Sequence, residues 1–347
     1  MNEQKKFLPE WYPQDAIMLT WPHKNSDWAD NLTSVEKVYF ELVKTIAEVE
    51  KVVIIFQDAK HQNHIIEQLT PIPQLDKQII WVQAAANDTW ARDHGPICVQ
   101  DPEQNIIAYN FIFNGWGNKF DAELDNQINQ NLFLQLKTKH HNIPLVLEGG
   151  SIETDGDGTL LTTKACLLNP NRNPEITADE LEQQLKSLFS VEQILWLANG
   201  ELAGDDTDAH IDTLARFAPG HTIIYQGCQD PHDHHYSALQ KMAHQLTDFR
   251  DIHQQPYQLF ELPWPSAQYN NEQQRLPATY ANFLFINQKV LLPVYGVEQD
   301  QAAIEVMQNA LPNHQIVAIN CRPIIEQFGS LHCLTMQLPQ GFLSSEV

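Results

Sequence analysis

Helical and β-rich patterns alternate along this chain at regular intervals. Amphipathic helices are expected to begin near Asp125, Thr177, Tyr236 and Asp300, about 50 to 65 residues apart, with several β-rich runs in each interval. No low-complexity linker or long block of charge divides the sequence. The pattern predicts one α/β domain spanning residues 1–347, built from several similar units. Functional residues are then expected on strand ends and loops that face a common centre.

Local signals place further elements. Residues 33–36 and 177–180 both match a capping box, in which Thr and a Glu three positions later satisfy free backbone N–H groups. Another helix is expected near Ala59. Runs rich in β-branched and aromatic residues indicate strands at residues 51–56, 78–82, 106–111, 193–197, 222–225, 283–286 and 290–292.

The charge of the chain narrows the classes of partner. Its formal net charge is −23, from 44 acidic and 21 basic residues. This balance disfavours nucleic acids and anionic membranes, which bind clustered Lys and Arg. It suits a cationic small-molecule ligand, although an acidic surface also simply keeps a protein soluble.

Cysteine usage and hydropathy indicate the compartment. The five cysteines are scattered and include no C-x-x-C pair, so neither a disulfide framework nor a zinc knuckle is expected. The first ten residues hold no apolar signal-peptide core, and no stretch approaches the ~20 apolar residues that a membrane span needs. We therefore expect a reduced, cytoplasmic enzyme.

Cys333 stands between a turn that contains Gly329 and the alternating apolar run at 334–339. This position places a thiol at the start of a strand, where a side chain can point into a cleft. A free cysteine is more often a small buried hydrophobe than a nucleophile. Taken alone, Cys333 is therefore a weak candidate for catalysis.

The densest polar cluster, residues 201–212, ends in His210-Ile211-Asp212. If this end is extended, His210 and Asp212 share one face, because side chains alternate along a strand. A histidine beside a carboxylate can serve as general acid and base near neutral pH. The alternative is a solvated acidic loop with an incidental histidine.

Two further carboxylates stand at informative places. Asp93 precedes His-Gly-Pro at a bend, where its carboxylate either binds a ligand or caps the backbone of the turn. The nearby Trp90 either forms a pocket wall or packs in the core. Glu148 ends an apolar run before Gly149 and Gly150. A buried carboxylate requires a partner, so Glu148 is expected to meet a cation or N–H donors. The glycine pair permits close approach of another segment or a ligand.

Residues 231–235, Pro-His-Asp-His-His, suggest a metal site but lack a second, separated group of ligands. Because they precede a helix, a solvated helix cap is the favoured interpretation. No phosphate-binding loop or G-x-G-x-x-G motif is present in the sequence.

Taken together, these motifs resemble the agmatine deiminase family of guanidine-modifying enzymes, relatives of the bacterial peptidylarginine deiminase. The resemblance covers nearly the whole chain through blocks at residues 11–16, 21–23, 90–96, 113–117, 147–152, 169–174, 205–212 and 332–333. It implies a pseudo-five-fold α/β propeller (the pentein fold) of repeated ββαβ-type units, with the active site in the central channel. It also implies an enzyme that needs no cofactor or metal, and a homodimer.

The resemblance also implies roles for individual residues. Cys333 would be the nucleophile, and His210 the general acid and base. Asp93 and Asp212 would hold the planar guanidinium through charge-assisted hydrogen bonds. The product would be a ureido compound, with ammonia as the leaving group.

Three further roles follow from the resemblance. Glu148 would orient His210 or contact the substrate. Asp206 would help to bind the substrate, and Trp90 would form a wall of the pocket.

The chain departs from its relatives just before His332-Cys333. Phe328 stands where agmatine-hydrolysing members usually have a glycine, and Ser330 where they have an asparagine. Hydrolysis of agmatine to N-carbamoylputrescine is the leading hypothesis, and another guanidine, such as free or peptidyl arginine, is the neighbouring one. Two other classes stay open: a metal-dependent hydrolase built on residues 205–212 with 232–235, and a non-catalytic protein that binds polyamines or guanidines.

Overall fold

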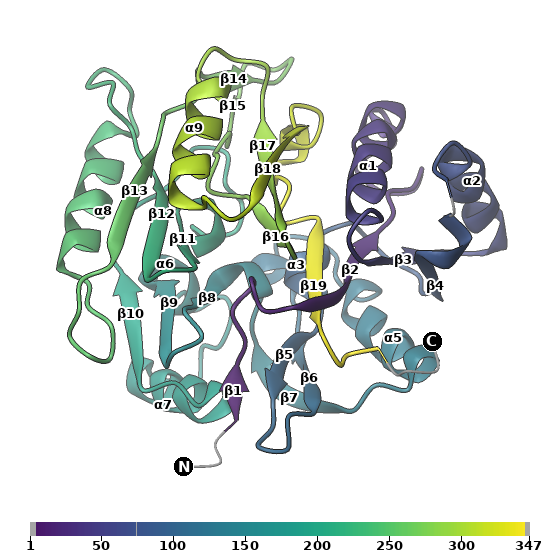
Figure 1. Cartoon of the computed structure of the whole chain (residues 1–347), viewed down its shortest axis with the longest axis horizontal. Coiled ribbons are helices and arrows are strands. Elements are labelled where there is room, and N and C mark those ends of the chain that lie inside the picture. The colour runs from purple at the N-terminus through teal and green to yellow at the C-terminus, as the bar shows by residue number, and fades with distance from the viewer. Residues whose placement is uncertain (1–4, 74, 344–347) are drawn as a thin grey trace.

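Five small sheets form the framework of residues 5–73 and 75–343, the part of the chain that this computed structural model describes (Figure 1). In each sheet two neighbouring strands pair antiparallel, and a third strand joins in parallel after a helical crossover. Parallel pairing requires such a crossover, whereas an antiparallel pair needs only a turn. The predicted α/β class is confirmed.

One sheet brings the C-terminal strand beside a strand from near the N-terminus. In spatial order its strands are β19 (Thr335–Pro339), β2 (Gln14–Thr20), β3 (Lys51–Phe56) and β4 (Ile79–Gln83), and its crossover helices are α1 (Leu32–Ile46) and α2 (Ala59–Leu69). Because β19 pairs with β2, the turn that carries Cys333 is anchored to the start of the chain.

The other four sheets follow one another along the chain. The first contains β1 (Lys6–Phe7), β5 (Ile97–Gln100), β6 (Ile106–Ile112) and β7 (His140–Val146), with the crossover helix α5 (Ile128–Leu136), and the second contains β8 (Ile152–Thr154), β9 (Thr159–Thr163) and β10 (Gln193–Leu197), with α7 (Ala178–Phe189). The third contains β11 (Ala215–Ala218), β12 (Thr222–Gln226) and β13 (Gln258–Leu262), with α8 (Tyr236–Asp248). The fourth contains β16 (Leu284–Ile286), β17 (Lys289–Val294) and β18 (Gln315–Asn320), with α9 (Asp300–Ala310).

Shorter elements connect these sheets. They are the ribbon of β14 (Gln268–Tyr269) and β15 (Arg275–Leu276), the short helices α3 (Ala91–His94), α4 (Gly115–Asn118) and α6 (Lys164–Leu167), and the 3₁₀ turns η1 (Leu75–Lys77), η2 (Asp125–Gln127), η3 (Gly149–Ser151), η4 (Ile211–Thr213) and η5 (Ile325–Gln327). Figure 1 shows α3 and β19 near the middle of the view, with α2, α5, α7 and α8 toward its edges.

Most expected boundaries are confirmed. The predicted β-rich runs all form strands, within two residues at each end, and helices begin at Ala59, Tyr236 and Asp300. The helix expected near Asp125 starts there as the 3₁₀ turn η2 and continues as α5.

The two predicted capping boxes have different outcomes. Thr177 and Glu180 form the box at the start of α7, with both reciprocal bonds present. The box at residues 33–36 is wrong, because α1 begins at Leu32 after Asn31. The carboxylate of Glu36 instead accepts hydrogen bonds from Trp21 Nε1 and His64 Nε2, at 3.2 and 2.6 Å. A long-range contact therefore replaces the local one.

Burial explains the strand sequences. The parallel strand β3 is covered on both faces, and its residues from Val52 to Phe56 are all buried. In α1 the buried residues include Val35, Tyr39, Leu42 and Ile46, the spacing expected for one helical face. Each helix thus covers a sheet with one stripe and leaves its polar side in water.

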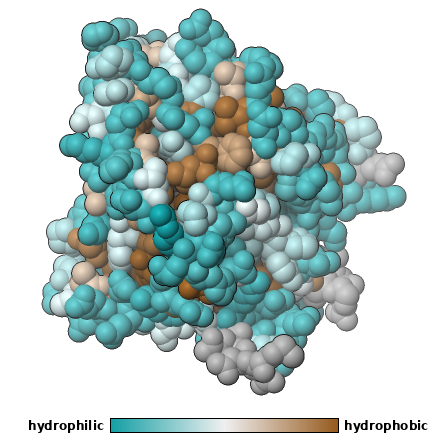
Figure 2. Space-filling view, turned by 60° about the vertical axis from the view of Figure 1, so that its left-hand side comes forward, coloured by the Kyte–Doolittle hydropathy of each residue, from teal (hydrophilic) through white to brown (hydrophobic). Residues whose placement is uncertain are grey.

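Hydrophilic residues cover much of the face seen in Figure 2, with smaller hydrophobic areas set between them. This distribution agrees with the net charge of −23. Within the described ranges, none of the helices is both long and apolar enough to span a bilayer. The N-terminal residues 1–4, on which the expected lack of a signal peptide partly rests, lie outside the described residues.

Candidate active site

Cys333 lies in the turn that immediately precedes β19, and its side chain is almost fully buried. The side chain of Asn282 fixes this turn, because Asn282 Oδ1 accepts the backbone N–H groups of His332 and Cys333 at 2.9 and 3.3 Å. Asn282 Nδ2 also lies 3.4 Å from the sulfur. The thiol therefore has a defined position, as expected for a functional group on a rigid support.

His210 and Asp212 do not lie on a strand, so the predicted extended conformation is wrong. His210 precedes the 3₁₀ turn η4, and the carbonyl oxygen of His210 accepts hydrogen bonds from the backbone N–H and the hydroxyl of Thr213, at 3.3 and 2.9 Å. β11 begins only at Ala215. The two side chains nevertheless converge, because η4 is packed against the glycine turn η3.

Gly150 marks the point of convergence. A Cβ atom added there would lie 2.7 Å from His210 Nδ1, 2.8 Å from Asp93 Oδ1 and 3.1 Å from Asp212 Oδ2. The predicted close approach at the glycine pair is confirmed, because at Gly149 an added Cβ would lie 2.3 Å from the carbonyl oxygen of Arg92. Only glycine leaves room for these groups to meet.

Asp93 lies on the short helix α3 and is held at both oxygens. Its Oδ2 accepts a hydrogen bond from Trp116 Nε1 at 2.8 Å, and its Oδ1 accepts the N–H of Gly150 at 3.1 Å. Burial raises the pKa of Asp93 to about 6; His210 lowers it, while Asp212 raises it. A bound cation would relieve this penalty by pairing with the buried carboxylate.

His210 is fully buried, and neither ring nitrogen has a hydrogen-bond partner among the described residues. Its closest carboxylate contact is between Nδ1 and Asp93 Oδ1, at 3.6 Å. An imidazole without a bonded partner is available to exchange a proton with a bound molecule.

Glu148 has the cationic partner that its burial predicts. Arg172 Nε lies 2.9 Å from Glu148 Oε1, and both side chains are fully buried. Arg172 continues to Asp208, whose Oδ2 accepts from Nη1 at 2.7 Å. Glu148, Cys166 and His210 have ligand atoms within 4.8 Å of one another. Glu148 thus lies beside His210 while its charge is neutralised by Arg172.

A cavity reaches the thiol from the surface. It is lined by Asp27, Asp88, Trp90, Asp93, Trp116, Phe120, Asp205, Asp206, Thr207, Thr213, Gln327, Phe328, Gly329 and Cys333. Of these described lining residues, five are aspartates and none is lysine or arginine. Trp90 and Asp206 therefore lie in the wall of this cavity, while His210, Asp212 and Glu148 are not among its lining residues.

Trp90 and Phe328 shape this cavity. Gly329 lies against the indole, since a Cβ added there would be 2.2 Å from Trp90 Cζ3. Phe328 adopts a left-handed backbone with φ of 64°, a conformation that glycine tolerates more easily. Ser330, the other departure, is buried, and its hydroxyl lies 3.1 Å from that of Tyr295. Of the two, Phe328 is the one that lines the cavity.

The thiol is electrostatically disfavoured as an anion. Burial raises the pKa of Cys333 well above its usual range, and the carboxylates of Asp212 and Asp93 raise it further. The Sγ–Oδ2 distance to Asp212 is 3.7 Å. In the free protein the sulfur is therefore a neutral thiol at pH 7.

Comparison with known proteins shows the family of this chain. A family model described as Porphyromonas-type peptidyl-arginine deiminase matches residues 6–339. The chain belongs to the Porphyromonas-type peptidyl-arginine deiminase family.

Relatives of this family member include proteins named for agmatine. A Vibrio parahaemolyticus protein named "Putative agmatine deiminase" is 32% identical, with 96% of each chain covered. The structure of a C. jejuni agmatine deiminase, a cysteine-to-serine variant with substrate bound, is 39% identical with a TM-score of 0.91, covering 98% of this chain and 97% of that one. Agmatine deiminase of Enterococcus faecalis is 27% identical, with a TM-score of 0.88 and coverage of 97% and 96%.

A more distant structure shares the fold alone. An amidinotransferase from Microseira wollei is 11% identical, with a TM-score of 0.54 over 97% of this chain. Its α/β architecture is therefore common to proteins well beyond the Porphyromonas-type family.

Sequence reasoning missed two residues of the site. Trp116, which bonds to Asp93, has a left-handed backbone with φ of 54° between Gly115 and Gly117, so the flanking glycines were a usable signal. Asn282, which holds the Cys333 turn, lies between two apolar residues and carries no local signal.

The histidine-rich segment before α8 is engaged in local structure. Asp233 Oδ1 accepts from the backbone N–H and the Nδ1 of His235, while Asp233 Oδ2 accepts from Trp264 and Arg275. His235 Nε2 accepts the N–H of Ala203 at 2.8 Å. The carboxylate of Asp233 therefore closes the turn before α8 and does not cap the helix, and the side chain of the N-cap residue His235 makes no cap bond, so the predicted solvated helix cap is wrong.

Proposed function

We propose that this chain is an agmatine deiminase, which hydrolyses agmatine to N-carbamoylputrescine and ammonia through a covalent thiol intermediate. One observation carries the proposal: the cavity that leads to Cys333 is lined by five aspartates and, within the described residues, by no lysine or arginine. Such a site favours a dication. Membership of a family with named agmatine deiminases supports the same reaction.

The distal group of the substrate distinguishes agmatine from arginine. Agmatine ends in an ammonium, which acids and aromatic rings bind, whereas arginine presents a carboxylate that needs a basic residue. Asp206 is half-buried in the wall, and burial followed by Asp205 raises its pKa above the usual value. A carboxylate in that state gains from a nearby cation.

Asp93 and Asp212 hold the guanidinium in the proposed mechanism. Both are buried, and Asp212 Oδ1 has no hydrogen-bond partner among the described residues. Paired carboxylates bind the N–H groups of a planar cation and keep it protonated, which keeps its carbon open to attack. They also place that carbon near Cys333, which converts binding into rate.

Binding of the substrate activates the thiol. Burial, Asp212 and Asp93 raise the pKa of Cys333, and a guanidinium bound beside these groups supplies the positive charge that favours the thiolate. The proton of the thiol passes to His210, the thiolate attacks the guanidinium carbon, and His210 gives this proton to the departing ammonia. A water molecule activated by His210 then hydrolyses the S-alkylthiouronium and releases the ureido product.

Supporting residues complete the proposed site. Glu148, neutralised by Arg172, orients the neighbouring His210 rather than accepting a proton. Trp90 walls the cavity beside Cys333. The mechanism calls on side chains only, without a metal ion or an organic cofactor.

We also propose that the five sheets form a pseudo-five-fold propeller within a single domain of residues 1–347. The shared pairing pattern of the sheets and the position of α3 and β19 near the middle of Figure 1 support it. The homodimer and the cytoplasmic location stay predictions, and light scattering of the purified chain measures the first.

The test is turnover. Purified protein is incubated with agmatine or arginine, and ureido product and ammonia are quantified. We expect the protein to turn over agmatine. Alkylation of its thiols should abolish this activity, whereas a metal chelator should leave it unchanged. Turnover of arginine or an arginyl peptide in place of agmatine would support the neighbouring hypothesis. Loss on chelation would favour a metal-dependent hydrolase, and binding without turnover a polyamine-binding protein.

A further inference from the structure

A chain of buried ionic groups extends from Asp212 away from the cavity. His332 Nδ1 lies 2.7 Å from Asp212 Oδ2, and His332 Nε2 lies 2.5 Å from Glu10 Oε2. Arg216 Nη2 contacts the same Glu10 oxygen at 2.9 Å. All of these residues are less than 8% exposed. The N-terminal segment, which carries Glu10, is thereby connected to a proposed substrate ligand.

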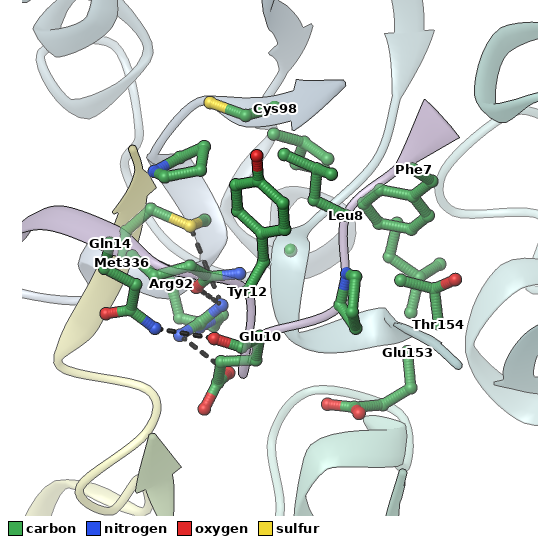
Figure 3. Close-up of a pocket in the computed structure, with 16 residues that line it drawn as sticks. Phe7, Leu8, Glu10, Tyr12, Gln14, Arg92, Cys98, Glu153, Thr154 and Met336 are labelled. Carbon is green, nitrogen blue, oxygen red and sulfur yellow. Dashed lines mark hydrogen bonds and ion pairs between the residues drawn. The ribbon is translucent and has the colours of Figure 1, made fainter. Parts of the chain in front are cut away.

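Glu10 also lines a second pocket, drawn in Figure 3, where its carboxylate points toward Arg92. Glu153 lies on the other side of that view and pairs with Arg216. The cluster therefore contains Arg92 and Arg216 as cations and Glu10, Glu153 and Asp212 as anions. With all three carboxyl groups ionised, a positive charge on His332 balances the set; burial raises the pKa of Glu153, while its partner Arg216 lowers it.

The hydrogen bonds give the same answer. A neutral imidazole has one N–H, but an imidazolium donates from both nitrogens. Each nitrogen of His332 faces a carboxylate oxygen at hydrogen-bond distance. The alternative is a neutral ring whose unprotonated Nε2 accepts a hydrogen bond from Arg216 Nη2 at 3.0 Å. The lone pair of Nε2 would then face the carboxylate oxygen of Glu10 at the shorter distance of 2.5 Å, and two acceptors would repel each other. The short contact favours the charged ring.

The charge on His332 has a consequence for Asp212. Burial alone would raise the pKa of Asp212, but the hydrogen bond and charge of His332, followed by His210 and Arg216, bring it below the usual value. Only Oδ2 is engaged by His332, while Oδ1 has no hydrogen-bond partner within the described part of the chain. One oxygen is thus fixed and the other is available.

We propose that His332 is a positioning residue, held as an imidazolium by Glu10, that keeps Asp212 ionised and oriented for the guanidinium. The inference rests on the proposed function, because it takes Asp212 as a substrate ligand. The charged and titratable groups that face this pair from the surrounding elements are Glu10, Arg92, Asp93, Glu153, His210, Arg216 and Cys333.

The first experiment measures the charge of the ring without any turnover. Full-length protein labelled with ¹⁵N at the histidine rings is studied by NMR at pH 7, and His332 is assigned from the signals lost in His332→Gln. Two protonated ring nitrogens are expected at pH 7. A ring with one unprotonated nitrogen overturns the proposal. If His332→Gln does not fold, Glu10→Gln provides the assignment through the shifted signals.

The second experiment follows kcat/KM for agmatine against pH. In His332→Gln the pKa of Asp212 rises, so the acidic limb, which Asp93 sets near pH 6 in the parent protein, should steepen as a second carboxylate titrates, and activity should fall at least roughly tenfold. In Glu10→Gln the imidazolium loses an anion, so the alkaline limb should move down. His235→Gln is the control, because His235 is also buried beside an aspartate, at 2.7 Å, but away from the cavity lining.

The two experiments separate the two claims. Lower activity with the position and steepness of both limbs unchanged, in either variant, shows a merely structural role for His332 and overturns the inference. Absence of agmatine turnover in the parent protein contradicts the proposed function instead, and the ring charge measured by NMR then still decides whether His332 is held as a cation. The kinetic arm is then repeated with whichever guanidine is turned over.

Discussion

The sulfur of Cys333 lies 3.7 Å from Oδ2 of Asp212, and this contact couples the protonation of the two groups. Burial raises the pKa of Cys333, and the carboxylate of Asp212 raises it further. A cation bound beside both groups removes this opposition. The free site is thus arranged so that the substrate itself completes the charge balance.

Replacing the sulfur tests its role directly. Cys333→Ser is expected to abolish turnover, by roughly 10³-fold or more in kcat, because serine has no accessible anion at neutral pH. Agmatine binding should persist, measured by calorimetry. Cys228→Ser is the control, since Cys228 is equally buried but contacts the carbonyl of Asp230 outside the cavity. Residual turnover near that of the parent protein would remove Cys333 from the mechanism.

Asp93 predicts a pH dependence of activity and of stability. With a pKa of about 6, raised chiefly by burial, Asp93 is protonated as pH falls through 6, so kcat/KM should fall there. Stability has the opposite trend. Because the folded pKa exceeds the unfolded value, the buried charge lowers stability as pH rises through about 4 to 6, by up to about 3 kcal/mol.

Urea unfolding of Asp93→Asn checks the stability sign. Relative to the parent protein, the variant should gain free energy of unfolding as pH rises from 4 to 8, while losing most of its activity. The exposed Asp157→Asn serves as the control and should show neither effect. A free-energy difference that does not change with pH would contradict the assigned shift.

The Arg172–Glu148 pair predicts strong coupling. Arg172→Met leaves Glu148 as an unpaired buried carboxylate, which costs about 3–5 kcal/mol of unfolding free energy. The double variant with Glu148→Gln should recover a large part of this loss. A double-mutant cycle from denaturant unfolding gives the coupling energy, and strict additivity of the two single variants would count against a paired charge.

Phe328 predicts a change in substrate selection. Phe328→Gly removes an aromatic ring from the cavity wall and relaxes a left-handed residue with φ of 64°. We expect the ratio of kcat/KM for bulkier guanidines, such as arginyl peptides, over agmatine to rise severalfold. Gln104→Gly is the control for the backbone effect, because Gln104 also has a left-handed backbone, with φ of 69°, but lies on an exposed turn. An equal ratio in both variants would show that the ring does not select.

Local sequence signals predicted most of the elements. Runs such as residues 51–56 form strands because their β-branched side chains fit a buried parallel sheet, and Thr177 caps α7 through contacts three residues away. The signal failed where distant residues compete. Glu36 bonds to Trp21 and His64 instead of capping α1, and residues 211–213, just after His210, form a 3₁₀ turn instead of a strand.

The sequence by itself determined which chemical groups are available: a thiol at Cys333, a His-x-Asp pair at 210–212, and carboxylates at Asp93 and Glu148. Only the tertiary structure decided how they are charged. Burial and partners from remote segments set each pKa. Asn282 contacts Cys333 across 51 residues of sequence, His332 contacts Asp212 across 120, and Glu10 contacts His332 across 322. Electrostatic interactions depend on distance in space and on exclusion of water, and a linear sequence specifies neither.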